Sequence, residues 1–260
     1  MPFAEIPDAQ IWYEDTGGDG VPVVFVHPAA ADSRCWVNQL PAFTAAGYRC
    51  ITFDQRGFGN SRQSPSATEA GHLSSDLEAL TQTLGLGPFV LVGAAYGGMG
   101  ALDYALRFQD RLRAFVLATS QGAIVDAEYQ EILNRIVPAA LRAIPIELRE
   151  VGPSYRAENP AGVARWLQII HEGHGETAPR QQRYLTLTLA LLEALHVPTL
   201  VLASDADLLA PPSLMRLLAD RIPGCEMATV ADAGHSAHWE RPEAWNKLVL
   251  DFLGRKTGTS

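Results

Sequence analysis

The stretch "LVGAAYGGMG" (residues 91–100) joins an apolar run to a helix-like segment through a turn bracketed by glycines. A strand, a sharp turn and a helix in this order present one side chain at the tip of the turn, and the glycines let the two backbones approach closely. Enzymes built this way carry a Ser, Cys or Asp nucleophile at the tip. Here the tip is Ala95, which has no reactive atom. The stretch therefore predicts a site architecture and leaves open where its nucleophile is.

Apolar runs of strand length recur along the chain and alternate with helix-like patterns. Most runs are continuous and rich in β-branched residues, as expected of strands buried on both faces. The predicted strands are residues 10–15, 21–27, 48–54, 88–93, 112–119, 198–204 and 226–232. The helical patterns lie at residues 76–86, 99–108, 212–222 and 242–253. This alternation predicts an α/β fold with a mostly parallel sheet and helices on both faces.

The alternation stops between residues 121 and 195. That stretch is helix-like but irregular, with interruptions at "IPIE", "VGPS", "AENPAG" and "HEGHGETAP". An insertion between two strands of a parallel sheet lies over the carboxyl ends of the strands, where loops gather. We therefore expect a core domain from residues 1–120 and 196–260, with a helical cap, or lid, at residues 121–195.

Composition narrows the classes of partner. The chain has 260 residues, 47% of them hydrophobic, and a net charge of −9 with scattered basic residues. Phosphate binding needs clustered Lys and Arg, so neither nucleic acid nor an anionic membrane is expected. The three cysteines form no CxxC pair, so we expect them to be reduced thiols. The sequence shows no signal-peptide pattern and no apolar run long enough to span a membrane. We expect a cytoplasmic monomer or homodimer that acts on a small molecule.

Several ordered segments resemble the motifs of the α/β-hydrolase family. The segments "HPAAADSRCW" (27–36), "FDQRGFGNS" (53–61) and "GHSAHWERPEAW" (234–245) look like that family's HGxxxSxxxW, DxRGxGxS and GHxxxxExPxxF motifs. The resemblance covers nearly the whole chain, from about residue 11 to residue 253. It implies the α/β-hydrolase fold, a mostly parallel eight-stranded sheet flanked by helices, with a helical cap inserted after the sixth strand.

The resemblance also implies a catalytic triad in the chain order nucleophile, acid, histidine. In this sequence these positions are Ala95, Asp207 and His235. A histidine takes the proton of a hydroxyl nucleophile, and a carboxylate fixes the histidine's tautomer. Asp207 and His235 each follow a predicted strand, so both belong on loops at the edge of the sheet that carries the turn. Asp205 is the alternative acid, but the family pattern GxxD, aligned with residues 204–207, favours Asp207.

An oxyanion hole is the second implied feature of the family. Its expected donors are the backbone N–H of Tyr96 and, by position in the HG motif, that of Ala29. This chain departs from the motif because Pro28 replaces the usual glycine and removes one N–H, so Ala30 is the second choice for the donor. Gly93 and Gly97 are expected to leave room for the close approach of the strand and helix backbones.

Four further side chains are candidates for binding substrate: Trp36, Tyr155, Trp166 and His238. Packing within the core or the lid explains each of them as well. His171 and His174 have a spacing that could suit a metal, but they lack a third ligand in register, so neither a metal nor a cofactor is expected. The glycines around Ala95 also miss the G-x-G-x-x-G spacing of a dinucleotide site.

Three explanations account for Ala95. In the first, Ala95 is an introduced substitution that removes a serine oxygen. In the second, the nucleophile was lost naturally and the chain is a binding or signalling protein. In the third, the enzyme needs no nucleophile and uses His235 as a base alone. The first is favoured because the glycines, acid, base and oxyanion loop are all retained and Ala differs from Ser by one atom. The expected native activity is hydrolysis of an ester, a lactone or a vinylogous diketone C–C bond in a moderately hydrophobic small molecule, with this chain itself nearly inactive.

Overall fold

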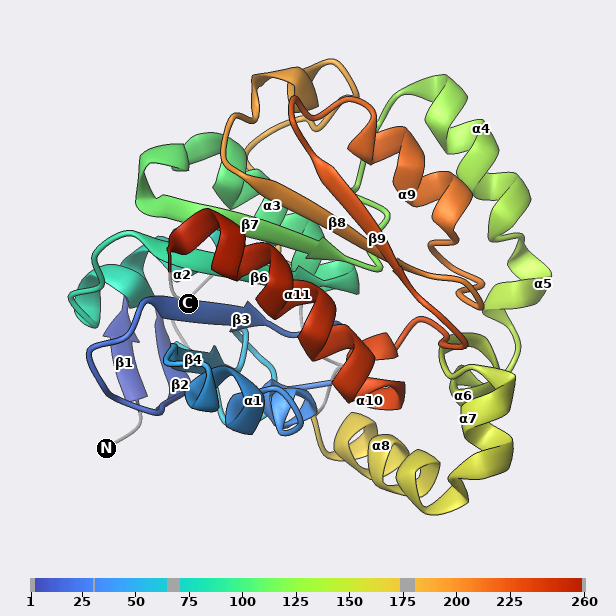
Figure 1. Ribbon diagram of the computed structural model, residues 1–260, viewed down its shortest axis with the longest axis horizontal. Helices are drawn as coiled ribbons and strands as arrows, with labels where there is room; N and C mark the ends of the chain where they lie inside the picture. The colour runs from blue at the N-terminus through green and yellow to red at the C-terminus, as the bar shows by residue number, and fades with distance from the viewer. Residues whose placement is uncertain (1–2, 30, 65–70, 174–180, 259–260) are drawn as a thin grey trace.

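The computed structural model describes residues 3–29, 31–64, 71–173 and 181–258, and it is built around one sheet (Figure 1). The strands follow the order β1-β2-β4-β3-β6-β7-β8-β9, and β5 pairs with β2 beside this path. Neighbours from β4 to β9 run parallel, whereas β1 and β2 are antiparallel. The strands are β1 (Phe3–Ile6), β2 (Ala9–Asp15), β3 (Pro22–Val26), β4 (Arg49–Phe53), β5 (Arg62–Gln63), β6 (Phe89–Ala94), β7 (Leu112–Ala118), β8 (Thr199–Ser204) and β9 (Glu226–Val230).

The eight strands of the main path confirm the mostly parallel sheet expected from the sequence. Two short strands, β1 and β5, had no individual signal, because four and two residues are too few to show a pattern. Consecutive residues of a central strand face opposite sides of the sheet: on β3, Val24 and Val26 join one buried cluster, whereas Val23 and Phe25 join the other. Burial on both faces explains why these strands are continuously apolar.

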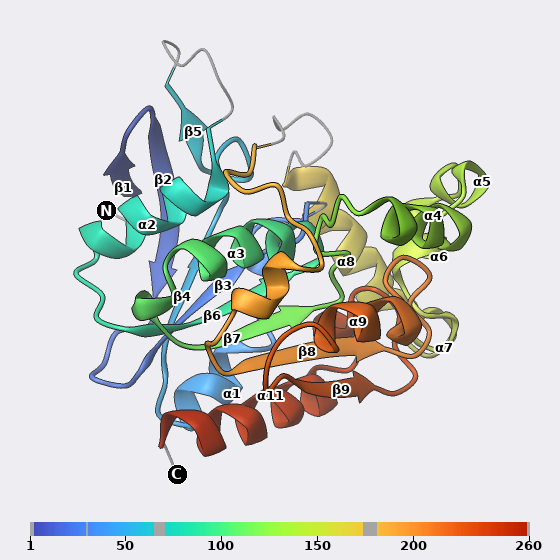
Figure 2. The same cartoon turned by 90° about the horizontal axis from the view of Figure 1, so that it is seen from above.

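Helices cover both faces of the sheet (Figure 2). Helices α2 (Leu73–Thr83), α3 (Ala95–Arg107) and α9 (Pro212–Ala219) contribute their apolar side chains to one cluster. Helices α1 (Leu40–Ala45) and α11 (Pro242–Thr257) contribute theirs to the other, and α11 packs on β7. Two layers of helices around a parallel sheet leave its carboxyl edge as the place where loops meet.

Five helices, which we call the cap helices, follow β7, the sixth strand of the eight-strand path. They are α4 (Ala127–Ile136), α5 (Ala139–Arg142), α6 (Ile146–Glu150), α7 (Pro153–Glu158) and α8 (Pro160–Glu172). A proline stands at or just before the first residue of each of α5 to α8, and it ends the preceding helix because it lacks an N–H. The cap helices lie together beyond the carboxyl ends of β7 and β8 (Figures 1 and 2).

The chain then returns along the core at residues 181–195, which include the 3₁₀ helix η3 (Leu191–Ala194). Leu187, Leu192 and Leu195 are buried in the same cluster as the apolar side chains of α3. This part of the expected lid therefore packs with the sheet and α3, while residues 174–180 lie outside the described part of the chain. The division of the chain into core and lid stays a prediction.

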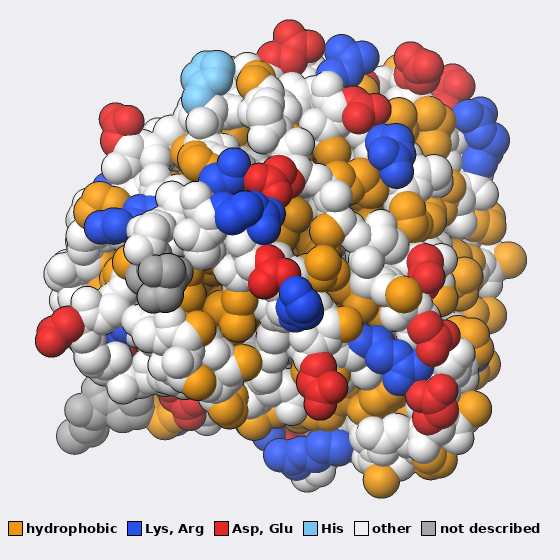
Figure 3. All heavy atoms as spheres, in the orientation of Figure 1, with side chains coloured by type: hydrophobic (Ala, Val, Ile, Leu, Met, Phe, Trp, Pro, Cys, Tyr) orange, Lys and Arg blue, Asp and Glu red, His pale blue; other side chains and the backbone are white. Residues whose placement is uncertain are grey.

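Acidic and basic side chains are interspersed on the face of the molecule drawn in Figure 3. Within the described ranges, no helix has both the length and the apolar character needed to cross a bilayer. The three cysteines are free, and Cys35 and Cys50 are buried.

Candidate active site

The turn between β6 and α3 holds Ala95 in an unusual backbone conformation. Ala94, the last residue of β6, is extended, and Ala95 begins α3 with a φ of +49°. Residues other than glycine adopt this left-handed region at a cost of about 1–3 kcal/mol, and they persist there only where the surroundings enforce it. The fold therefore presents the side chain of Ala95 at the tip of the turn, although a methyl group gains nothing from that position.

Glycines enforce this turn, as the sequence predicts. A Cβ atom added at Gly97 would lie 2.4 Å from the carbonyl oxygen of His27, and one added at Gly93 would lie 2.6 Å from the Cβ of Ala101. Both distances are far below van der Waals contact, and in each case the neighbour is backbone or a rigid methyl group. Only glycine at both positions lets α3 approach β3 and β6 this closely.

Ser120, which no sequence pattern singled out, also supports the turn. Its hydroxyl donates to the carbonyl oxygen of Ala95 at 2.6 Å, which ties the turn to the end of β7. Ser120 is fully buried, and its hydroxyl proton is committed to this bond. A single serine after a strand carries no signal by which the sequence could have revealed this contact.

The two expected oxyanion donors lie at the start of α3 and after β3. Tyr96 is the second residue of α3, where backbone N–H groups point out of the helix end. Ala29 follows Pro28, whose carbonyl oxygen accepts the N–H of Ala31 at 3.2 Å and a hydrogen bond from Nδ1 of His27 at 2.8 Å. These bonds close the turn that contains Ala29. Ala30 is outside the described residues, and the role of both donors stays a prediction.

Asp207 and His235 lie side by side on the loops after β8 and β9. Nδ1 of His235 is 3.0 Å and 2.9 Å from the two carboxylate oxygens of Asp207. The backbone N–H groups of Leu209 and Ala210 also donate to Oδ1 of Asp207, at 2.8 Å and 3.0 Å. This carboxylate is therefore held in place before it orients the imidazole. Asp205, the alternative acid, instead accepts the N–H of Asp232 at 2.7 Å.

The Asp207 carboxylate decides the charge of His235. Burial by itself lowers the pKa of His235, but the negative charge of Asp207 and its hydrogen bond outweigh this, and the pKa rises to about 9. With Nδ1 committed to Asp207, the proton that His235 can exchange with a ligand is the one on Nε2. The pair can thus act as an oriented base when neutral and as a cationic donor when protonated.

Two of the four candidate substrate residues, Trp36 and His238, are buried side by side, and their contact with substrate stays a prediction. The rings of Trp36 and His238 pack against each other with centroids 4.7 Å apart, and Trp36 also contacts Phe25 and Trp245. Trp36 has no exposed surface and His238 is 3% exposed, so in this conformation they support the core. Burial and the nearby His235 lower the pKa of His238 to about 3, so it is neutral.

The other two candidates are on the cap helices. Tyr155 of α7 is largely buried, and its hydroxyl accepts a hydrogen bond from Asn159 at 3.2 Å. Trp166 of α8 is buried in the same apolar cluster as Ile169 and Ile170. Their contact with substrate stays a prediction. Among the described residues no group of His, Cys, Asp or Glu side chains could hold a metal ion, and His174 lies outside those residues.

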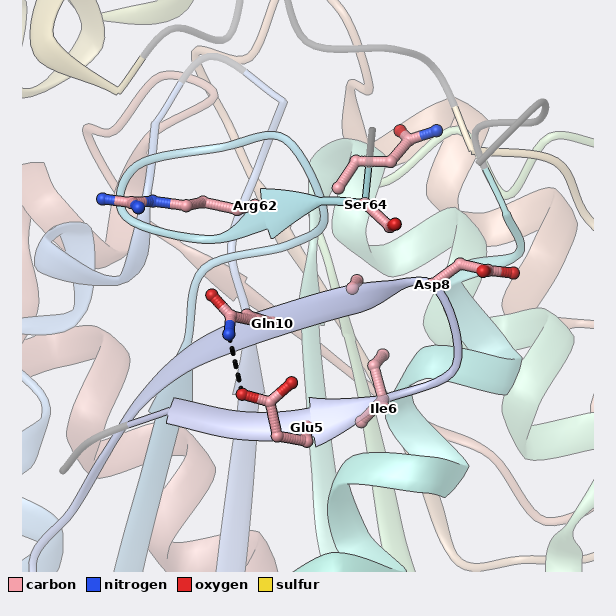
Figure 4. A pocket seen from close by; sticks show the side chains of 8 residues that line it. Glu5, Ile6, Asp8, Gln10, Arg62 and Ser64 are labelled. Carbon is pink, nitrogen blue, oxygen red and sulfur yellow. Dashed lines mark hydrogen bonds between the residues drawn. The ribbon is translucent and has the colours of Figure 1, made fainter. Parts of the chain in front are cut away.

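A separate groove of about 570 Å³ lies at the β1 end of the sheet (Figure 4). It is lined by Glu5, Ile6, Asp8, Ala9, Gln10, Arg62, Gln63 and Ser64. One polar pair closes part of it, because Nε2 of Gln10 donates to Glu5 at 2.8 Å. Strands β1 and β2 begin the strand order and β8 and β9 end it, so this groove is distinct from the Asp207–His235 pair.

Comparison with known proteins agrees with this architecture. A family profile described as alpha/beta hydrolase fold matches residues 21–242. The solved structure of a thermophilic esterase from Thermogutta terrifontis is similar, with 28% identity, a TM-score of 0.80 and coverage of 98% of this chain and 97% of that one. A bromoperoxidase structure from Bacillus anthracis has 26% identity, a TM-score of 0.75 and coverage of 96% and 98%.

A hydrolase named for 2-hydroxy-6-oxononadienedioate and 2-hydroxy-6-oxononatrienedioate, from Burkholderia vietnamiensis, is 26% identical over 95% of this chain and 92% of its own length. The family profile spans most of the chain, and the mostly parallel sheet is the one that the resemblance implies. The chain belongs to the α/β-hydrolase family.

Proposed function

We propose that this chain carries a serine-hydrolase site from which the nucleophilic oxygen is missing. The observation that carries the proposal is the φ of +49° at Ala95. A strained turn that an alanine does not need is retained because it presents a nucleophile, and Ala differs from Ser only by the oxygen. The same site results whether Ala95 replaced a serine by design or by natural loss.

The proposed substrate is a small, moderately hydrophobic carbonyl compound. An ester, a lactone or a vinylogous diketone would place its carbonyl oxygen at the N–H groups of Tyr96 and Ala29, with His235 beside the attacked carbon. A solved structure named as an esterase and a relative named as a 2-hydroxy-6-oxononadienedioate hydrolase support this range of chemistry. Without the oxygen, the chain binds such a compound and turns it over very slowly.

Restoring the oxygen tests the proposal. Ala95→Ser is expected to hydrolyse at least one member of a panel containing an activated ester, a lactone and a vinylogous diketone. His235→Ala in the same background is expected to remove most of that activity, because the hydroxyl then has no base. A folded Ala95→Ser protein that hydrolyses none of the panel contradicts the proposal.

One observation favours a second function, in which His235 acts as a base without a nucleophile. The Asp207–His235 pair is complete in the chain as it stands, and the pKa of His235 is raised to about 9. Such a pair could remove an acidic proton from a bound carbonyl compound. Exchange of a substrate C–H proton with solvent deuterium, catalysed by the unaltered chain and lost in His235→Ala, is the outcome that would support this function over hydrolysis.

A further inference from the structure

Glu240 is a buried carboxylate beside the candidate site that the proposed chemistry does not use. It ends α10 (Ala237–Glu240) and is 3% exposed. One of its oxygens, Oε2, accepts two backbone hydrogen bonds, from Gly152 at 2.8 Å and from Gly234 at 3.0 Å. Its other oxygen, Oε1, has no hydrogen-bond partner within the part of the chain that the structure describes. Burying a carboxylate costs stability unless hydrogen bonds or a counter-charge compensate it, so a buried carboxylate with one unpartnered oxygen needs an explanation.

The two donors come from separate parts of the molecule. Gly152 precedes α7 and belongs to the cap helices, whereas Gly234 immediately precedes His235. A third hydrogen bond joins the same two segments, from the N–H of Ser236 to the carbonyl oxygen of Glu150 at 3.1 Å. The residues on both sides of His235 are therefore bonded either to the cap segment at residues 150–152 or to the carboxylate that holds it.

The two backbones also touch directly. A Cβ atom added at Gly234 would lie 2.5 Å from the nitrogen of Gly152, and one added at Gly152 would lie 2.9 Å from the nitrogen of Gly234. Figure 1 shows α10 beside the cap helices α6 to α8, which agrees with this contact. The two segments are therefore in van der Waals contact, joined by one direct hydrogen bond and bridged by the two that Glu240 accepts.

We propose that Glu240 is a positioning residue that couples the cap helices to His235. Because one Glu240 oxygen accepts hydrogen bonds from both Gly152 and Gly234, it fixes the loop that holds the His235 imidazole against Asp207. A displacement of the cap segment at residues 150–152 is therefore transmitted to His235. The coupling itself does not depend on the proposed hydrolysis, but its effect on turnover rests on that function. The family motif includes Glu240, but its spacing alone assigns no role to that residue.

The charges around His235 give this coupling a measurable signature. Burial lowers the pKa of the His235 imidazole, whereas the negative charges of Asp207, Glu150 and Glu240 raise it. His238 is also nearby, because the charge of His235 lowers the pKa of His238. Burial raises the pKa of Glu240, while the N–H groups that it accepts act in the opposite direction. Loss of the Glu240 carboxylate is therefore expected to lower the pKa of His235.

Nuclear magnetic resonance of the unaltered Ala95 chain and its variants tests the coupling without any need for turnover. Glu240→Ala is expected to speed amide hydrogen exchange at both Gly152 and Gly234 by at least tenfold and to shift the His235 imidazole signals. Glu240→Gln keeps a carbonyl acceptor but not the charge, so it should restore the protection of both amides while the pKa of His235 still falls. Glu243→Gln, at an exposed acid three residues further on, is the control and should change neither.

A change made in the cap alone provides the second variant. Gly152 has a φ of −61°, which alanine adopts freely, so Gly152→Ala acts only through its contact with Gly234 and Glu240. It should move the His235 signals, whereas Gly87→Ala, where a Cβ meets nothing within 4 Å, should not. Unchanged His235 signals in both Gly152→Ala and Glu240→Ala overturn the proposal, as does loss of protection at Gly234 alone in Glu240→Ala.

The effect on turnover is measured separately, in the Ala95→Ser background. Glu240→Ala is expected to lower kcat at least tenfold with little change in KM, and Glu240→Gln is expected to recover most of kcat. A rise in KM without a fall in kcat contradicts a positioning role. So does a Glu240→Gln variant whose kcat does not recover. If Ala95→Ser does not hydrolyse the panel, the proposed function fails while the exchange and imidazole measurements still decide the coupling.

Discussion

The two halves of the candidate site differ in what they retain. The turn at Ala95 has a strained backbone, crowded glycines and the bond from Ser120, yet the side chain at its tip is a methyl group. The loops after β8 and β9 hold the proposed acid and base, with Nδ1 of His235 2.9 Å from Asp207. The turn depends on contacts spread over many residues, so replacing one side chain leaves its shape intact, whereas the chemistry of the turn depends on a single oxygen.

A second contrast lies within the acid–base half. His235 and His238 are three residues apart and both buried, but the pKa of His235 rises to about 9 while that of His238 falls to about 3. Burial lowers both, and only His235 has a carboxylate partner. The protonation state of a buried histidine therefore follows from its partner rather than from its depth.

The largest expected effect removes the carboxylate from the acid–base half. In the Ala95→Ser background, Asp207→Asn is expected to lower kcat by about 10⁴, because the amide no longer holds the imidazole in the right tautomer or stabilises its positive charge. Initial rates on the best ester or lactone substrate measure this. Asp205→Asn is the matched control on the same loop and should change kcat by less than about threefold, since Asp205 contacts Asp232 instead. Equal losses in the two variants would show that Asp207 is not the acid.

The sequence predicts the sheet and the turn better than it predicts which residues pack around Asp207 and His235. Continuous apolar runs and their order predict the sheet, because burial on both faces leaves a direct trace in composition. The order of Ala95, Asp207 and His235 points to residues that the fold brings to one edge. By contrast, nothing in the sequence shows that the rings of Trp36 and His238 pack against each other. The hydrogen bond between Gly152 and Glu240 also has no sequence signal, because it connects residues 88 positions apart.

The next effect concerns the contribution of His235 to the free energy of unfolding. The pKa of His235 is raised above its unfolded value, so its contribution to stability is fully present below about pH 6.5 and is lost as the pH rises through about 9. The shift corresponds to about 3 kcal/mol. Urea unfolding of the chain and of His235→Gln at pH 6 and pH 9.5 measures it, as the difference in unfolding free energy between the two proteins. That difference is expected to shrink at the higher pH, and one that does not depend on pH would contradict the raised pKa.

The smallest expected effect concerns the turn. It is the difference in ground-state binding affinity between the Ala95 and Ala95→Ser forms. The expected oxyanion donors are backbone N–H groups, which a change of the Ala95 side chain does not remove. A nucleophile's oxygen makes its main contribution in the transition state rather than in the bound ground state. We therefore expect the Ala95 and Ala95→Ser forms to bind a non-hydrolysable carbonyl analogue with affinities within about tenfold, or about 1.4 kcal/mol. Isothermal titration calorimetry with the same analogue measures both affinities. If the Ala95 form binds several orders of magnitude more weakly, the turn half has been remodelled beyond one atom, and the contrast between the two halves of the site no longer holds.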